Sequence, residues 1–207
     1  NLTVEFFNAG HILGSTGILI DFGIKKVYFT GDIGRPNDKI LRSPDVFPQA
    51  DYIICESTYG NKLHKPSVDM KANLLNIVEH TCVQKKGKLI IPAFAIDRTQ
   101  ELVYALDQLE AEGLLPKINV YIDSPLSVKA TQVIRKFQED FNHEIKQYIK
   151  GFGDAFGFGN LHYLTDVEES KKLNESTEPC IIISSSGMAE AGRIKHHIAN
   201  NIENQAN

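Results

Sequence analysis

The chain has 207 residues, 42% of them hydrophobic, and a net charge of −4, a composition that predicts a globular protein with a buried core. No apolar run approaches the roughly 18–20 residues that cross a bilayer. The first residues, NLTVEFFNAG, lack the basic segment of a signal peptide, so we expect neither a membrane span nor a signal peptide. The acidic balance gives no global attraction to nucleic acid, which leaves a local basic channel as the alternative.

The first fifty or so residues are predicted to form β structure. Short β-branched and aromatic runs separated by glycine turns stand at LTVEFFNAG, TGILIDFG and KKVYFTGD. After a connection rich in Pro and Asp, DYIICES is a continuous apolar run, which predicts a strand that is buried on both faces if it lies in a layered sheet.

From about residue 65 the pattern changes to alternating helices and strands. Strands are predicted at KLIIPAFA, INVYIDS, LHYL and PCIIISSS. Helices between them are predicted from their caps: Ser67, an Asp97–Gln100 capping box, and Ser124 followed by Pro125. Further helices are expected at DVEESKKL and from about Met188.

Strands that alternate with helices imply a parallel sheet covered by helices on both faces. The chain is therefore predicted to be α/β, with a β-rich domain at 1–60 and an α/β domain at 61–207. No internal repeat is visible.

The cysteines indicate the redox environment. The three of them lie far apart and form no CxxC pair, and Cys55 and Cys180 sit inside apolar runs. We expect buried, reduced thiols in a cytoplasmic protein and no zinc site built from cysteine.

Three polar residues follow apolar runs at predicted strand ends. His11 lies in the glycine-rich turn NAGHILGS, Asp32 ends VYFTGD, and Glu56 ends YIICE. Each has an ordinary structural alternative: a surface histidine, a turn cap and a surface ion pair. Together they favour a site at one edge of a sheet, where histidine nitrogen and carboxylate oxygen can hold a divalent ion.

The blocks NAGHILGS, GDIGR, ESTYG, PAFAIDRTQEL, DSPL and SSSGMAEAGR follow one another in this chain. In this order they resemble the β-CASP family of metallo-β-lactamase-fold nucleases, and among these the branch of the pre-mRNA cleavage endonuclease and its prokaryotic relatives. The resemblance covers nearly the whole chain. It implies a β-CASP domain preceded by strands of a partial metallo-β-lactamase (αββα) domain.

The resemblance also implies roles for the three strand-end residues. His11 matches a ligand to one zinc ion, and Asp32 matches the carboxylate that bridges two zinc ions. Glu56 matches an acid that orients a histidine acting as general acid on the leaving oxygen. Asp32 and Glu56 are therefore the catalytic candidates, and His11 and Asp32 the metal ligands.

Residues Ser184, Ser185, Ser186 and Gly187 match a family loop beside the RNA backbone. A Ser/Gly turn between a strand and a helix also exposes N–H groups that suit a phosphate, with a simple helix cap as the equal alternative. Arg98 is predicted to clamp a phosphate, with a surface or interdomain ion pair as the alternative.

Two other stretches receive structural interpretations. Asp123 in YIDSPL is read as a structural turn. The segment GFGDAFGFGN is predicted to be a mobile lid or loop, with base stacking by Phe152, Phe156 or Phe158 as the weaker alternative.

The family's leading motif, His-x-His-x-Asp-His, is absent, and its later histidine motifs are absent as well. We therefore expect a fragment of a zinc-dependent nuclease that cleaves single-stranded RNA, inactive alone and without its two zinc ions. Endonuclease and exonuclease activity are both open, and a homo-oligomer is among the open alternatives. A non-catalytic RNA-binding or scaffold member of the family is the alternative function. A nucleotide-binding module is disfavoured, because GxGxxG and GxxxxGK[ST] are missing.

Overall fold

The computed structural model describes residues 1–63 and 69–207, so the predicted cap Ser67 lies outside the described residues. The chain divides into two compact units. The N-terminal unit comprises Asn1–Pro66 and Phe137–Tyr148, and the C-terminal unit comprises Ser67–Lys136 and Ile149–Asn207. A short segment from within the range predicted for the second domain thus packs with the first unit.

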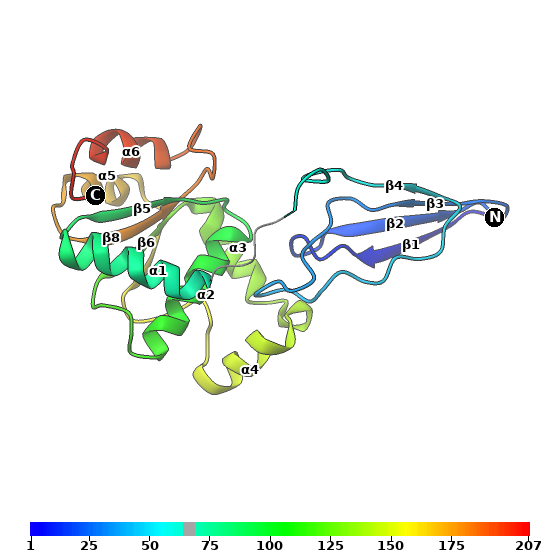
Figure 1. Ribbon diagram of the computed structural model, residues 1–207, viewed down its shortest axis with the longest axis horizontal. Helices are drawn as coiled ribbons and strands as arrows, with labels where there is room; N and C mark the ends of the chain where they lie inside the picture. Colours follow the sequence, from blue (N-terminus) through cyan, green and yellow to red (C-terminus); the bar gives the residue numbers. More distant parts are fainter. Residues whose placement is uncertain (64–68) are drawn as a thin grey trace. The chain divides into compact units, whose positions relative to one another are not determined.

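The N-terminal unit is built on a four-stranded sheet in the order β1-β2-β3-β4 (Figure 1). Its strands are β1 (Thr3–Asn8), β2 (Thr16–Asp21), β3 (Lys26–Phe29) and β4 (Tyr52–Ile54). The first two pairs are antiparallel and the β3–β4 pair is parallel. Asn8, the last residue of β1, pairs with Thr16, and Phe29 and Ile54, the last residues of β3 and β4, pair with each other. The carboxyl ends of β1, β3 and β4 therefore meet at one edge of the sheet.

The two faces of this sheet differ in exposure. On one face Leu19 and Tyr28 are buried, and Phe7 and Phe47 pack around the Tyr28 ring. The other face is apolar but half-buried to exposed in every strand. The strand register places on it Val4, Phe6, Ile18, Ile20, Val27, Phe29, Tyr52 and Ile54. We call these residues the apolar sheet face.

The expectation that DYIICES is buried on both faces is wrong. Ile53 and Ile54, on opposite faces of β4, are 53% and 55% exposed, because no second layer of described residues covers either face of this strand. Cys55, which follows β4, is exposed as well, while Cys82 and Cys180 are buried free thiols. Burial raises the pKa of the Cys180 thiol to about 11.

The segment 137–148 closes one side of the N-terminal unit. It contains a 3₁₀ turn, η2 (Gln138–Asp140), and the start of α4 (His143–Phe152). Phe141 is buried and forms an isolated bridge with Leu41, and the Arg42 N–H donates to the Asp140 carbonyl at 2.9 Å. Backbone pairing and a buried ring therefore hold this segment to the long connection between β3 and β4.

The C-terminal unit is a parallel α/β domain. Its strands are β5 (Lys88–Pro92), β6 (Asn119–Asp123), β7 (Leu161–Leu164) and β8 (Cys180–Ser184), in the order β5-β8-β6-β7. Every residue of the central strand β8 is buried. The helices are α1 (Met70–Val78), continued by the π-helical turn η1 (Glu79–Gln84), then α2 (Arg98–Ala111), α3 (Pro125–Ile134), α5 (Val167–Glu175) and α6 (Ile194–Asn201).

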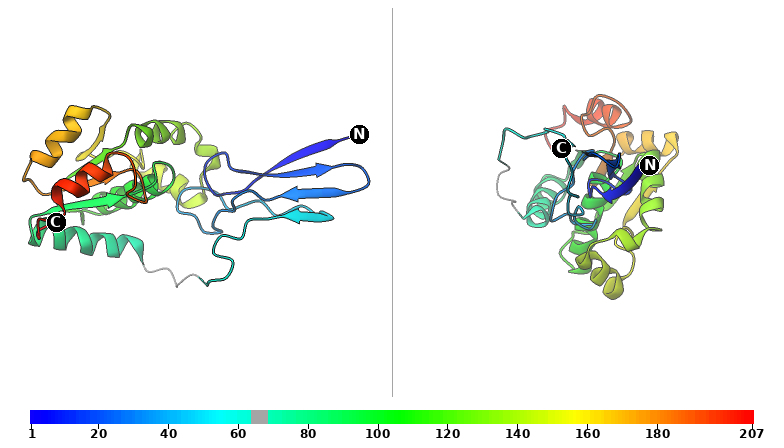
Figure 2. Two further views of the ribbon diagram at one scale, coloured as in Figure 1. Left: turned by 90° about the horizontal axis from the view of Figure 1, so that it is seen from above. Right: turned by 90° about the vertical axis from the view of Figure 1, so that its right-hand side faces the viewer.

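Helices cover both faces of the parallel sheet. Helices α5 and α6 lie on one face, and α1 and α2 on the other (Figures 1 and 2). Right-handed crossovers require this arrangement, because the chain moves in one direction from β5 to β6 and back in the other from β7 to β8. The predicted α/β class with a parallel sheet is confirmed.

The caps of the helices were predicted with mixed success. The Ser124 hydroxyl accepts the Ser127 N–H at 3.2 Å with Pro125 at the first helical position, as expected. The capping box of α2 is wrong. Asp97 has a φ of 71° and makes no side-chain cap bond, and the buried Gln100 amide donates inward to the Ala95 carbonyl.

The segment GFGDAFGFGN is attached to the core. Phe156 is buried, which removes it from the alternative of base stacking. Its carbonyl accepts hydrogen bonds from the Arg135 guanidinium at 2.6 Å and from the Tyr163 hydroxyl at 2.7 Å. Arg135 also pairs with Asp154 at 2.7 Å. These contacts replace the predicted mobile lid with a loop tied down through Phe156.

Lys88 at the start of β5 is a buried ammonium that joins two helix ends. Its Nζ donates to the Leu173 carbonyl in the last turn of α5 at 2.7 Å and to the Asn201 side-chain oxygen at the end of α6 at 3.1 Å. A cation here complements the negative carboxyl ends of helices. Burial nevertheless lowers the pKa of Lys88 below the ordinary lysine value.

We predict that the contribution of Lys88 to the stability of the chain increases as the pH rises in the alkaline range. Between the lowered pKa of Lys88 in the folded chain and the unfolded value near 10.4, the unfolded chain holds a proton on Lys88 that the folded chain has released. The contribution of Lys88 to the free energy of unfolding therefore rises with pH. The contribution of one group is at most about 1.4 kcal/mol per pH unit. Urea unfolding between pH 8 and 10.5 should show the stability of the original chain rising with pH relative to that of Lys88→Met, because the opposing contribution of buried thiols such as Cys180 is common to both proteins.

The exposed Lys85→Met is the matched control, because Lys85 lies nearby on the surface and should leave the slope unchanged. An identical slope in Lys88→Met and the original chain would show that Lys88 is not the group responsible.

Candidate functional site

His11 is held in a defined turn between β1 and β2. The Ser15 hydroxyl accepts the N–H groups of His11 at 3.0 Å and Ile12 at 3.2 Å, and the Ala9 N–H donates to the Ser15 carbonyl. Gly10 adopts a φ of 67°, a conformation that glycine takes without strain. The backbone of this turn is thus fixed, while His11 itself is exposed.

Asp32 and Glu56 follow β3 and β4 at the same edge of the sheet. The Glu56 carboxylate accepts the Ile33 N–H at 2.5 Å, next to Asp32. The Gly34 N–H donates to the Ala9 carbonyl at 2.8 Å, and a Cβ on Gly34 would lie 1.8 Å from the Gly10 carbonyl oxygen. The turn that carries Asp32 therefore packs directly on the turn that carries His11.

Glu56 is a hydrogen-bond acceptor in this arrangement. The Ile33 N–H, the Thr58 hydroxyl and the neighbouring His11 outweigh partial burial and lower the pKa of Glu56 below its usual range. The carboxylate is consequently ionised at neutral pH. It can orient a proton donor, but it has no proton of its own to donate.

The kinds of donor at this edge suit zinc, but their number does not complete a site. Imidazole nitrogen and carboxylate oxygen are both ordinary zinc ligands, and zinc usually takes four. Within residues 1–63 and 69–207, His11, Asp32 and Glu56 do not bring three ligand atoms within 4.8 Å of one another. The edge formed by these three residues is called the His11 edge below.

In the C-terminal unit, the predicted Ser/Gly loop follows β8 at the carboxyl edge of the parallel sheet. Ser184 is buried, and its hydroxyl donates to the Asp123 carbonyl at 2.8 Å. Its predicted direct contact with RNA is therefore replaced by a supporting role. Ser185, Ser186 and Gly187 are half-buried and form the outer part of the loop.

The helix predicted from Met188 starts later, at Ile194, because the intervening residues form a hydrogen-bonded loop. The Ser186 N–H donates to the Ala191 carbonyl at 3.1 Å, and the Ile194 N–H donates to the Ser185 carbonyl at 3.3 Å. We call residues 185–193 the serine loop. The end of this loop lies beside its start, so the first residue of α6 is bonded to Ser185.

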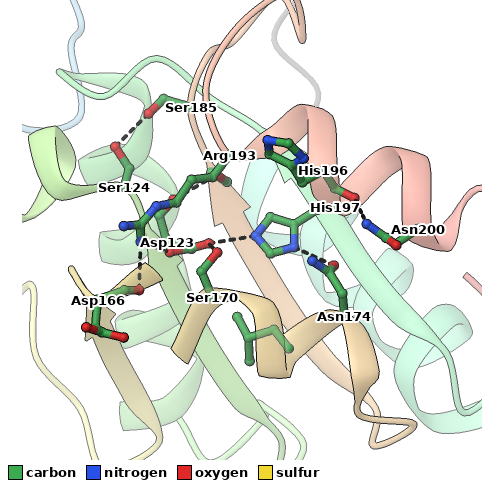
Figure 3. Close-up of polar contacts among 12 residues, drawn as sticks. Asp123, Ser124, Asp166, Ser170, Asn174, Ser185, Arg193, His196, His197 and Asn200 are labelled. Atoms are coloured by element: carbon green, nitrogen blue, oxygen red, sulfur yellow. Dashed lines mark hydrogen bonds and ion pairs between the residues drawn. The ribbon is translucent and has the colours of Figure 1, made fainter. Parts of the chain in front are cut away.

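Both ends of the serine loop are attached to the corner after β6. At the first end, the hydroxyls of Ser185 and Ser124 lie 2.6 Å apart (Figure 3). At the other end, Arg193 donates to the Asp123 carboxylate at 2.6 Å and to the Thr165 carbonyl at 2.7 Å. The corner at residues 123–124 therefore sets the position of the whole loop.

Asp123 is more than the structural turn that the sequence suggested. Its fully buried carboxylate accepts the Ser170 hydroxyl at 2.5 Å from α5, and it contacts His197 Nε2 at 2.7 Å from α6 (Figure 3). Burial alone would raise the pKa of Asp123, but the bonds to His197, Ser170 and Arg193 prevail and lower it. The Asp123 carboxylate, at the end of β6, is therefore an ionised centre bonded to α5, to α6 and to Arg193 just before α6.

Arg98 forms an ion pair within its own helix, in line with the alternative interpretation of this residue. Its guanidinium lies 2.5 Å from the carboxylate of the buried Glu101, one turn further along α2. A phosphate clamp at Arg98 would have to share the guanidinium with this carboxylate.

In the part of the chain that the structure describes, no helix combines the length and apolar character needed to cross a membrane. A parallel sheet with a hydroxyl-rich loop at its carboxyl edge defines an α/β protein that can bind a ligand there. Comparison with known families assigns it further: residues 99–207 match the model of the Beta-Casp domain. The chain belongs to the Beta-Casp family.

Its relatives bear the names of RNA-processing proteins. Ribonuclease TTHA0252 of Thermus thermophilus is 30% identical over 206 residues, which are 100% of this chain and 47% of that protein. An RNase J-like protein of Methanocaldococcus jannaschii is 34% identical over 96% of this chain and 46% of its own length. The cleavage and polyadenylation specificity factor subunit 3 of Dictyostelium discoideum is 31% identical, over 92% and 24%. The chain spans about half the length of the first two relatives.

We predict that Asp123→Asn destabilises the protein by about 3 kcal/mol at pH 7, because it leaves Arg193 without its buried counter-charge. The folded pKa of Asp123 lies below the unfolded value near 3.9, so this stability is present above pH 4 and is lost as the pH falls toward the folded pKa. Urea unfolding between pH 7 and pH 2.5 should therefore show the stabilities of the two proteins becoming more alike in acid.

The control is Glu110→Gln at an exposed position, which should not lower the stability at pH 7. A gap between Asp123→Asn and the original chain that stays constant down to pH 2.5 would contradict the prediction.

Proposed function

We propose that the full-length protein is a zinc-dependent ribonuclease that hydrolyses phosphodiester bonds in single-stranded RNA. The observation that carries the proposal is the His11 edge, where a histidine and two carboxylates follow three strands at the same end of one sheet in a member of the Beta-Casp family. The names of the relatives, which include ribonuclease and RNase J-like protein, support the same activity.

In this proposal His11 and Asp32 are ligands in a site for two zinc ions. When bound, zinc lowers the pKa of a coordinated water and offsets charge on a phosphate. Among the described residues, His11 and Asp32 are the donors that this proposal assigns to the site, and further ligands would complete it, since a zinc ion usually takes four. Glu56 orients a proton donor for the leaving oxygen, a role that suits a carboxylate already ionised at neutral pH.

The serine loop is proposed to hold the RNA backbone. Ser185 and Ser186 offer hydroxyls at the carboxyl edge of the sheet, and Gly187 lets a phosphate approach the backbone closely. Arg193 is already bonded to Asp123 and Thr165, so it fixes the loop and leaves phosphate binding to the outer residues. Arg98 is a weaker candidate for the same task, because Glu101 holds its guanidinium.

Residues 1–60 are proposed to be part of a larger metallo-β-lactamase-fold domain. The apolar sheet face supports this, because a sheet normally buries one face and here the second face is apolar too. In the full-length protein further residues would cover it. The fragment alone is then inactive and retains no zinc. The buried free thiols Cys82 and Cys180 favour a cytoplasmic location.

Loss of His11 should remove both metal and activity. In the full-length protein, His11→Ala should lower the zinc content measured by mass spectrometry after dialysis. Since loss of a group behind a ligand costs 10–100-fold, loss of a ligand should slow the cleavage of single-stranded RNA by at least about 100-fold. The control is His80→Ala, because His80 is exposed and contacts Gln84 in its own helical turn. Removal of zinc with a chelator should abolish cleavage in the original protein.

Unchanged zinc content together with unchanged cleavage in His11→Ala would overturn the proposal. A full-length protein that binds RNA and yet cleaves none with zinc present would favour the alternative, a non-catalytic RNA-binding or scaffold member of the family.

A further inference from the structure

An exposed aromatic ring stands beside the serine loop. Phe94 follows β5 at the carboxyl edge of the parallel sheet, and it is 56% exposed. Its backbone is fixed, because the Phe94 carbonyl accepts both the hydroxyl of Thr99 at 2.7 Å and the N–H of Thr99 at 3.3 Å. A ring on a fixed backbone loses little conformational freedom when it binds a ligand.

The Phe94 ring and the serine loop form one continuous surface. The ends of β5 and β8 are neighbours, since Pro92 pairs with Ser184 and the Ala93 N–H donates to the Ser184 carbonyl. A Cβ on Gly187 would lie 2.9 Å from a carbon of the Phe94 ring and 3.0 Å from the Phe94 nitrogen. Gly187 therefore lacks a side chain where the loop packs against the ring.

The surface next to this contact combines apolar and hydrogen-bonding groups. Met188, the next residue, is 69% exposed, and the hydroxyl-bearing residues Ser185 and Ser186 precede Gly187 in the same loop. An exposed ring binds the flat face of an unpaired base, and hydroxyls bind the phosphate or ribose attached to it. A single ring flanked by hydroxyls suits a nucleotide better than it suits a broad apolar protein interface.

We propose that Phe94 stacks on an unpaired nucleobase of the RNA whose backbone lies on the serine loop. This inference rests on the proposed function and adds a base-binding residue to it. The stacking is indifferent to sequence, because every base has an aromatic face. It also selects unpaired RNA, because the faces of bases within a duplex are already stacked on their neighbours.

The test is RNA binding by the full-length protein in the presence of a chelator, which prevents cleavage. Fluorescence anisotropy with a labelled single-stranded oligonucleotide should show that Phe94→Leu weakens binding about 5- to 100-fold, the usual range for one stacked base. Phe94→Trp should restore most of the affinity, since it restores an aromatic face. Phe22→Leu is the matched control, because Phe22 is an exposed phenylalanine, 51% exposed, in the turn between β2 and β3. Thermal unfolding of each variant confirms that it is folded.

A second oligonucleotide, with the same backbone but abasic positions, separates base contacts from phosphate contacts. The original protein should bind it more weakly than the intact oligonucleotide, whereas Phe94→Leu should bind the two alike. If the original protein binds RNA and Phe94→Leu binds it equally well, or loses the same factor on both oligonucleotides, the stacking proposal is overturned while the nuclease proposal stands. If the original protein binds no single-stranded RNA, the proposed function fails and the stacking role fails with it.

Discussion

The C-terminal unit is organised around a negative charge that water cannot reach. A fully buried carboxylate is tolerated only when positive and hydrogen-bonding groups surround it. Asp123 therefore requires Ser170 from α5, and Arg193 and His197 from the chain after β8. Since Arg193 also holds the end of β7 through Thr165, one carboxylate joins the elements that make up the carboxyl edge of the sheet. The position of the serine loop follows from this requirement.

The loop after β8 is fixed by residues at both of its ends. Ser184 and Arg193 are turned toward Asp123, and the Ser185 hydroxyl lies 2.6 Å from the hydroxyl of Ser124. The N-terminal unit repeats the principle with other chemistry, because Ser15 fixes the turn from which His11 projects. In both units the end of a strand carries a loop that is held by its own hydrogen bonds.

The sequence predicted the elements better than their surroundings. Apolar periodicity located the strands, and the Ser124–Pro125 signal located the start of α3, because those features act over a few neighbouring residues. Periodicity cannot reveal whether another layer covers a strand, so β4 was expected to be buried and is exposed. The predicted Asp97–Gln100 capping box does not form, because the Gln100 side chain lies in the core and donates to the Ala95 carbonyl. The late start of α6 and the role of Arg193 depend on a partner, Asp123, that is distant in sequence. The quoted block SSSGMAEAGR contained Arg193, but nothing local indicated where its guanidinium would point.

The central claim is that RNA lies on the carboxyl edge of the parallel sheet. Photocrosslinking of the full-length protein to single-stranded RNA containing 4-thiouridine, followed by mass spectrometry of the attached peptides, measures this directly. The account predicts crosslinks in the serine loop and at Phe94. Crosslinks concentrated at the opposite, amino edge, in the groove lined by Val83, Lys86, Lys117 and Pro179, would contradict it.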